Sequence, residues 1–306
     1  MKGPLSRRSL ILGAAAAAGS ALLSGCDRLG NAEWFRRTLK TGEDANMFVQ
    51  RLLLTEAKLA PEYAESDISP WFKPNGTAAP PDKAYRALVK RKFADYRLEI
   101  GGLVETPLQL SLAELRALPS RTQVTRHDCV EGWSCIGKWT GVPLSELLNR
   151  ARLKPEARFI VFHCADTMGQ GEDPNGESTD QGGQQAQGGN ANPSMTKQSG
   201  ANEDRQSSGG QQEAGEASGS GMPIRYYESI DLVDAYHPQT ILAYDMNGKV
   251  LPVEHGAPLR LRLERQLGYK MAKYVMRIEV VESFADIGEG QGGYWEDQGY
   301  AWYAGI

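Results

Sequence analysis

The sequence lacks several features by which large classes of protein are recognised. It has no Walker-type phosphate loop, which argues against a nucleotide enzyme. It has no Cys-x-x-Cys-His motif for covalent haem, so an electron partner would be a separate protein. Basic residues are not in excess, because the formal net charge is -4 at pH 7, and we expect no nucleic-acid partner.

A hydrophobic run of bilayer-spanning length is also lacking. The apolar run from Leu10 to Leu23 is rich in alanine and glycine and is too short to cross a bilayer comfortably. It follows the basic residues Lys2, Arg7 and Arg8, which is the pattern of a cleaved signal peptide. The segment Ser6–Ile11 resembles a twin-arginine export signal, and that route carries proteins that are already folded.

The predicted signal peptide, residues 1–26, ends in Leu23-Ser24-Gly25-Cys26, which resembles a bacterial lipobox. In a lipobox the cysteine is lipid-modified and becomes the mature N-terminus. Asp27 resembles the residue that retains some lipoproteins at the inner membrane. We therefore predict lipidation of Cys26 and a location at the periplasmic face of the inner membrane. The alternative is a plain cleaved signal with an incidental cysteine.

Cysteine is scarce, with only four residues in the chain. Lipidation of Cys26 would leave three, which is an odd number in an oxidising compartment. At least one of Cys129, Cys135 and Cys164 must then be free or bound to another group.

Residues 169–221 lack aromatic side chains, and Met195 is their only large apolar residue. A segment so rich in Gly, Gln and Ser cannot bury enough surface to offset its ordering entropy, so we predict that it is disordered. We interpret it as a surface-loop insertion in a domain of residues 27–306, because the cost of loop closure grows slowly with length. A linker between two independent domains is the alternative.

The rest of the sequence predicts a mixed α+β fold, because short strands outnumber helices and regular βαβ alternation is absent. Ser111-Leu-Ala-Glu114 is a capping box that opens a short helix. Asn247-Gly248 between two apolar runs predicts a hairpin. A further helix is predicted over residues 83–93, and strands over residues 96–100, 159–162, 241–246, 250–253, 259–263 and 274–281.

Three chemical interpretations fit the cysteines of the central segment Arg126–Leu148. Zinc could be bound by His127 together with the three cysteines, although Cys129 and Cys135 lie farther apart than in the usual zinc knuckle. Those two cysteines could instead form a structural disulfide. The third interpretation is a lone thiolate that is the ligand of a soft metal.

Two parts of the chain resemble the sulfite-oxidase superfamily of molybdenum enzymes. The likeness extends from about Trp71 to Glu282, excluding the insertion, and is nearest to the bacterial branch that includes the catalytic subunit of the periplasmic methionine-sulfoxide reductase system. The first part is Cys129-Val-Glu-Gly-Trp-Ser, then Trp139-Thr-Gly-Val-Pro-Leu and a short helix. The second part comprises His237–Gly248, Leu251-Pro252, His255-Gly-Ala-Pro-Leu-Arg260 and Gly268-Tyr-Lys-Met-Ala-Lys273.

The resemblance implies mixed sheets with peripheral helices, in a molybdopterin-binding fold of the sulfite-oxidase type, and a molybdenum–molybdopterin cofactor (Moco). Cys129 would be the protein ligand to molybdenum, because soft sulfur donation tunes the metal for oxygen-atom transfer. Arg260 and Lys273 would bind the pyranopterin phosphate, the first by its planar fork and the second as a point charge. The remaining residues that the resemblance places at the cofactor are Asn75, Cys164, His255, Met271 and Ala272.

The chain departs from the family pattern at three places. The nearest relatives have Asn at the position of His255 and Thr at the position of Cys164. The arginine cluster that gathers sulfite in true sulfite oxidases is not evident, because Val-Glu-Gly follows Cys129. These departures make a sulfoxide-like substrate a better expectation than sulfite.

We therefore predict an exported molybdenum oxidoreductase that catalyses two-electron oxygen-atom transfer on a sulfoxide or another small oxo substrate. The resemblance also implies a membrane cytochrome b as electron partner. Two alternatives stay open: a sulfite-oxidising enzyme, and a non-enzymatic lipoprotein that keeps the fold and a Cys129–Cys135 disulfide. Measuring molybdenum in the purified protein distinguishes the enzyme from the lipoprotein.

Overall fold

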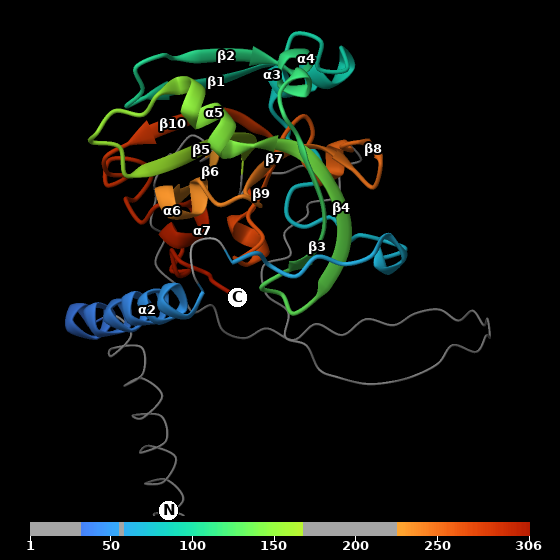
Figure 1. Ribbon diagram of the computed structural model, residues 1–306. Coiled ribbons are helices and arrows are strands. Elements are labelled where there is room, and N and C mark those ends of the chain that lie inside the picture. Colours follow the sequence, from blue (N-terminus) through green and yellow to red (C-terminus); the bar gives the residue numbers. More distant parts are fainter. Residues whose placement is uncertain (1–31, 55–57, 168–224) are drawn as a thin grey trace, which may run out of the picture.

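The computed structural model describes residues 32–54, 58–167 and 225–306, which form two five-stranded sheets with short helices around them (Figure 1). The predicted signal peptide, the lipidation residue Cys26 and the predicted insertion at 169–221 lie outside the described residues.

The first sheet is mixed and has the strand order β2-β1-β10-β5-β6. Strand β1 runs parallel to β10, whereas the other neighbours are antiparallel. This arrangement confirms the predicted α+β class with mixed sheets. The strands are β1 (Arg97–Gly102), β2 (Leu108–Ser111), β5 (Phe159–Thr167), β6 (Arg225–Asp231) and β10 (Val275–Val281).

The second sheet has the strand order β3-β4-β7-β8, and β9 pairs with β7 beside it. The predicted hairpin is present between β7 and β8, where Asn247 and Gly248 adopt φ values of 52° and 75°. Two successive residues with positive φ are what a type I′ turn requires. The strands are β3 (Arg121–Asp128), β4 (Ser134–Pro143), β7 (Ile241–Met246), β8 (Lys249–Val250) and β9 (Arg260–Arg262).

Apart from one 21-residue helix, the helices of the described residues are eight residues long or shorter. The capping box is formed as predicted: Ser111 Oγ accepts from the Glu114 amide, and the Glu114 carboxylate accepts from the Ser111 amide. The predicted helix over residues 83–93 stops earlier, because Lys92 and Phe93 have positive φ. The helices are α2 (Glu33–Leu53), α3 (Lys83–Lys90), α4 (Leu112–Ala117), α5 (Leu144–Ala151), α6 (Leu232–Ala235) and α7 (Tyr294–Asp297), with short 3-10 turns η1 (Glu65–Asp67), η2 (Val253–His255) and η3 (Gly268–Lys270).

The main hydrophobic core joins the two sheets. Ile100 and Phe162 from the first sheet are buried in the same cluster as Val142 and Leu242 from the second. Helix α5 adds four fully buried residues to it. A smaller cluster surrounds Trp139, which is completely buried. Because the core is shared, residues at the ends of both sheets are held in fixed relation to one another.

The two ends of the insertion are neighbours in the first sheet. Strands β5 and β6 pair along their length, and Thr167 lies directly opposite Arg225. The chain therefore leaves and re-enters the fold at adjacent positions of one antiparallel ladder. This geometry is compatible with a loop insertion at 169–221, which stays a prediction.

Helix α2 is a feature that the sequence analysis did not predict. It is 21 residues long and lies near the C-terminus, below α6 and α7 in Figure 1. Its last turns are attached to the fold, because Gln50 donates to the carbonyl of Gly305 and Arg51 pairs with Asp231 and Asp234. No helix among the described residues is long and apolar enough to cross a membrane.

Candidate active site

Cys129 lies at the tip of the hairpin that joins β3 to β4. Its amide donates to the carbonyl of Trp133 at 2.9 Å, and its carbonyl accepts from Gly132 at 3.0 Å. Gly132 has a φ of 85°, which favours glycine at this turn. The thiol is half-buried and lines a cavity. Burial raises the pKa of this thiol, and a hydrogen bond from the backbone of Glu131 acts in the opposite direction.

The cavity beside Cys129 has a volume of about 130 Å³. One side of it is aromatic, with Tyr226, Tyr269, Trp295 and Tyr300. The other side is polar and is formed by Cys129, Asn75, Asp166 and Lys273. Chain segments that are far apart in sequence therefore meet here. Asp166 and Tyr226 come from β5 and β6 of the first sheet, and Cys129 comes from the turn between β3 and β4 of the second.

Arg260 is a completely buried cation next to the cavity. Its guanidinium donates to Asn75 Oδ1 and to the carbonyl of His255, both at 3.2 Å. Burial lowers its pKa to about 9, and the neighbouring charge of Arg262 adds to this effect. A buried cation that is hydrogen-bonded to neutral oxygens is electrostatically suited to an anionic ligand.

Lys273 is a second buried cation on the same side. Its ammonium donates to the carbonyls of Asn75 at 2.7 Å and Glu254 at 3.0 Å, and also to that of Thr77. Burial lowers its pKa to about 7, and the charge of Arg260 contributes to the shift. Two buried cations so close together favour a ligand with negative charge, as the resemblance implied.

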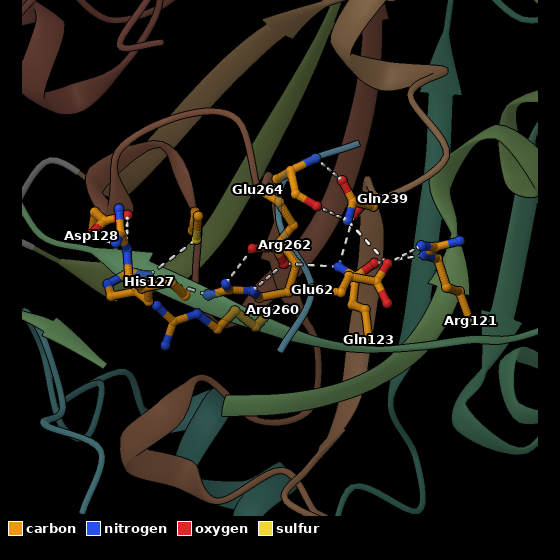
Figure 2. Close-up of polar contacts among 12 residues, drawn as sticks. Glu62, Arg121, Gln123, His127, Asp128, Gln239, Arg260, Arg262 and Glu264 are labelled. Atoms are coloured by element: carbon orange, nitrogen blue, oxygen red, sulfur yellow. Dashed lines mark hydrogen bonds and ion pairs between the residues drawn. The ribbon is translucent and has the colours of Figure 1, made fainter. Parts of the chain in front are cut away.

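His127 connects this site to a buried polar network (Figure 2). Its Nδ1 lies 3.2 Å from both the Met271 sulfur and the Arg262 guanidinium. Arg262 in turn forms a double hydrogen bond to the carboxylate of Glu264, at 2.9 and 2.7 Å. Burial lowers the pKa of His127 well below its ordinary value, and the charge of Arg260 acts in the same direction. The imidazole is therefore held in its neutral form.

The network continues from Glu264 to the molecular surface. Gln123 donates to Glu264 at 2.8 Å and to the carbonyl of Gln239 at 3.0 Å. Gln239 donates to Glu62 at 3.1 Å, and Glu62 pairs with Arg121 (Figure 2). These bonds fix the side chains that hold His127 in place.

Asp166 was not predicted from the sequence, although it lies four residues beyond the predicted strand 159–162 and within the observed strand β5. Its carboxyl is buried at the cavity, and burial raises its pKa to about 7, while the charge of Lys273 opposes the shift. The signal that could have found it is the acidic residue in Phe159–Asp166, a segment otherwise mostly apolar.

Several buried polar atoms of this site have no hydrogen-bond partner among the described residues. They are Nε of Arg260, Nε2 of His127, Nδ1 of His255 and Oδ1 of Asp166. Buried polar atoms are normally satisfied, so the unpaired donors fit a ligand that carries acceptor oxygens and ring nitrogens. A pterin with a phosphate has both, and the residues present therefore fit the implied cofactor.

The predicted cofactor residues do not all face the cavity. Asn75, Met271 and Lys273 line it together with Cys129, and Arg260 and His255 are bonded to each other beside it. Cys164 is buried in the hydrophobic core on β5, where burial raises its thiol pKa. Its role at the cofactor stays a prediction.

The backbone around Met271 and Ala272 is already engaged. The Met271 amide donates to the carbonyl of Gly268 at 3.1 Å, and the Ala272 carbonyl accepts from Leu261 at 2.8 Å. The backbone at Gly268 lies very close to another residue, because an added Cβ would be 2.3 Å from Cε1 of His127. The group that the Gly268 backbone approaches is therefore the His127 side chain.

The two other interpretations of the cysteines do not match the geometry. Cys129, Cys135 and Cys164 are free thiols, so the Cys129–Cys135 disulfide is not formed. Within the described ranges, no three His, Cys, Asp or Glu side chains gather in a group that could hold a metal ion. The zinc site proposed from His127 and the three cysteines is therefore not assembled.

Comparisons with known proteins agree with this geometry. A family model described as the oxidoreductase molybdopterin binding domain matches residues 86–182 and 203–286. A methionine-sulfoxide reductase subunit, YedZ1, of Azospira oryzae is 33% identical over 98% of this chain and 86% of its own length. The methionine-sulfoxide reductase catalytic subunit MsrP of Xanthomonas axonopodis is 30% identical over 67% of this chain, which spans only 50% of that relative.

A solved structure is also similar to this chain. The sulfane dehydrogenase SoxCD of Paracoccus pantotrophus aligns with 62% of this chain and 39% of its own, with a TM-score of 0.40 and 22% sequence identity. The match to the family model and the YedZ1 alignment show the family. The chain belongs to the molybdopterin-binding oxidoreductase family and is an oxidoreductase.

Proposed function

We propose that this protein reduces sulfoxides by oxygen-atom transfer at a molybdenum–molybdopterin group held in the cavity beside Cys129. The observation that carries the proposal is the juxtaposition of the Cys129 thiol with the buried cations Arg260 and Lys273. The names of the YedZ1 and MsrP relatives support a sulfoxide substrate.

When bound, the cofactor supplies two-electron oxygen-atom transfer, which protein side chains alone do not perform. The overall reaction is R₂SO + 2 H⁺ + 2 e⁻ → R₂S + H₂O. Cys129 would be the protein ligand, while Arg260 and Lys273 would hold the phosphate. The neutral imidazole of His127 would donate or accept one hydrogen bond through Nε2.

The other residues of the cavity suit a neutral sulfur substrate. The aromatic side formed by Tyr226, Tyr269 and Trp295 would pack against a thioether methyl group, since sulfur contacts aromatic rings favourably. Asp166, with a pKa of about 7, would hold a proton at Oδ1 near neutral pH. The reaction consumes two protons, so a buried carboxyl beside the cavity is a suitable donor.

We also propose that the protein works outside the cytoplasm. The Arg7-Arg8 pair and the apolar run after it support export by the twin-arginine route, and Cys26 supports a lipid anchor at the periplasmic face of the inner membrane. A membrane cytochrome b would supply the two electrons one at a time. An anchored enzyme would stay close to such a donor.

The test combines cofactor analysis with a substrate panel. Purified protein should contain close to stoichiometric molybdenum and pterin, and should oxidise a reduced viologen dye when given methionine sulfoxide or a sulfoxide-containing peptide. Dimethyl sulfoxide and trimethylamine N-oxide test the breadth of the site. Activity with sulfite and an oxidising dye, but none with sulfoxides, would establish the sulfite-oxidising alternative. Protein without molybdenum after expression in a molybdenum-replete host would contradict the proposal.

A further inference from the structure

Helix α2 contacts the rest of the described fold through Gln50 and Arg51, which lie on one side of the helix. Near its C-terminal end, Arg51 pairs with Asp231 at 2.5 Å and also with Asp234, and its guanidinium lies over the ring of Tyr303 at 5.1 Å. Gln50 donates to the carbonyl of Gly305 at 3.1 Å. These contacts fix which side of the helix faces the fold.

The opposite side of α2 is an exposed apolar stripe. Trp34, Phe48 and Leu52 are 63%, 67% and 69% exposed, although side chains of this size are usually buried. Ala45 and Val49 lie between them on the same side. The spacing of Trp34, Ala45, Phe48 and Leu52 follows the helical repeat, so their side chains lie along one line.

Two threonines complete this stripe. Thr38 and Thr41 turn their hydroxyls back to the carbonyls of Trp34 and Arg37, at 2.9 and 3.0 Å. Hydroxyls satisfied in this way leave the rest of the side chain outward. The stripe therefore extends along most of the helix, which is about 30 Å long at ~1.5 Å per residue.

We propose that this stripe of α2 lies in the surface of a lipid bilayer. Trp34 and Phe48 are aromatic residues of the kind that occupy the boundary between headgroups and acyl chains. The helix is not apolar enough to span a membrane, so it would lie along the surface. An amphipathic helix with one side bound to protein and an apolar opposite side fits this position.

The sequence just before the helix supports a lipid occupant. Cys26 lies seven residues before Glu33, so the backbone between them can reach at most about 25 Å at ~3.5 Å per residue. A lipid on Cys26 would hold α2 within reach of the bilayer. In this respect the inference rests on the proposed anchor, while the exposed stripe is an independent observation.

Such a position would bring the cavity close to the membrane. Gln50 of α2 bonds to Gly305, and Gly305 pairs with Gln266, three residues before Tyr269, so the helix ends near Tyr269. Tyr269 contacts Tyr300 at a ring distance of 5.2 Å, and both line the cavity. The substrate cavity would then open beside the surface on which a membrane electron donor is embedded.

The test places the purified full-length protein in vesicles of phosphatidylcholine and phosphatidylglycerol whose acyl chains carry bromine, which quenches nearby tryptophan. Trp34 is one of six tryptophans, so its share of the fluorescence is the difference in emission between wild type and Trp34→Phe. We expect this share to lose about half or more of its intensity. Equal quenching of wild type and Trp34→Phe would overturn the proposal.

A matched pair of double variants tests the stripe itself. Phe48→Glu with Leu52→Glu should abolish the quenching of Trp34, whereas Leu39→Glu with Leu53→Glu should preserve it. Leu39 and Leu53 are 53% and 71% exposed but point away from the stripe, so both pairs add the same charge to the same helix. Circular dichroism and cofactor content check that each variant is folded.

Two further outcomes separate the occupants. Shielding of Trp34 that occurs only in native membranes, and not in lipid vesicles, would show a protein partner and overturn the lipid assignment. An unmodified Cys26 with Trp34 still quenched would reject the lipid anchor and leave this inference intact. A lipidated Cys26 without quenching of Trp34 would reject this inference alone.

Discussion

Cys129 and Cys135 lie on the same hairpin but have different surroundings. Cys129 lines the cavity, whereas the Cys135 thiol lies beside the Trp71 carbonyl at 3.8 Å, outside that lining. Cys129→Ser should lower activity by more than the roughly 10- to 100-fold that loss of an outer partner of a metal ligand costs. It should also change the electronic absorption spectrum of bound molybdenum. Cys135→Ser should keep both the activity and the spectrum. If only Cys135→Ser changed them, the ligand would be Cys135 and not Cys129.

Asp166 gives the cofactor-free protein a characteristic pH dependence. A carboxyl whose pKa rises on folding stabilises the folded state below its ordinary pKa near 4, and this stability is lost as pH rises to about 7. Asp166→Asn should therefore reduce the fall in melting temperature between pH 4 and 7, by about 2–4 °C for each kcal/mol that the carboxyl contributes. Lys273 acts outside this window, because its pKa is lowered to about 7 and its contribution is lost as pH falls from about 10.5 to 7.

Thermal unfolding of the cofactor-free protein at about pH 4.5, 5.5 and 6.5 measures this effect. These values lie between the ordinary pKa of an aspartate and the raised pKa of Asp166. Asp95→Asn is the control, because that carboxylate is in an exposed pair with Arg91. A profile of Asp166→Asn that is parallel to wild type would show that Asp166 does not carry the shift.

For single residues, the sequence predicted which side chains belong to the site better than it predicted what those side chains contact. Cys129, Asn75 and Lys273 line one cavity, as the motif resemblance implied. Asp166 was missed because no local motif distinguishes a buried aspartate that faces a cavity from one that caps a turn. Cys164, in contrast, was predicted at the cofactor but is buried in the hydrophobic core. Its position in the sequence does not determine whether its thiol points to the cavity or to the core.

Among the elements, η3 packs against β3 through Gly268, where an added Cβ would lie 2.3 Å from the His127 ring. Gly268→Ala should lower the free energy of unfolding by about 1–3 kcal/mol, because the buried ring has little room to move. Gly101→Ala on β1 is the control, since nothing lies within 4 Å of its added Cβ. Chemical denaturation measures both, and equal stability of the two variants would show that His127 can give way.

Elements with apolar periodicity or a turn motif could be predicted, and those without either were missed. The Asn247-Gly248 turn and the α4 capping box are confirmed at the expected residues, whereas β8 is Lys249–Val250 and not the predicted 250–253. Strands β3 and β4 were not predicted, although they carry Cys129. The inward residues of β3 include Gln123, Thr125 and His127, which are polar and buried by the network, so the strand shows no alternation of apolar and polar residues.

For the whole molecule, the insertion offers a simple test of modularity. Thr167 and Arg225 are opposite one another at the ends of β5 and β6, so a short turn can join these strands. Replacing residues 169–221 with such a turn should leave the melting temperature within about 2 °C of wild type and keep the molybdenum content, because we expect a segment of this composition to make few contacts. Loss of folding would show that the segment carries structure.

The class of the fold could be predicted from the sequence, but its assembly could not. Mixed α and β content follows from local patterns, whereas the pairing of β1 with β10 joins strands that are far apart along the chain. The cavity depends on such long-range pairing, because Cys129 lies in the turn between β3 and β4 of one sheet and Asp166 lies on β5 of the other. Helix α2 was missed because its apolar residues form a stripe that the fold itself does not cover.

The optical signal of Trp139 should report whether the cofactor is bound. Its indole is completely buried, with the guanidinium carbons of Arg262 and Arg260 at 4.3 and 5.3 Å from the ring. Light absorption and emission by an indole respond to nearby charge, and an anion bound to Arg260 would offset part of that field. Cofactor loading should therefore shift the near-ultraviolet circular dichroism and emission of Trp139, without any need to observe the metal. The shift should vanish in Trp139→Phe, and a signal that persists there would come from another tryptophan.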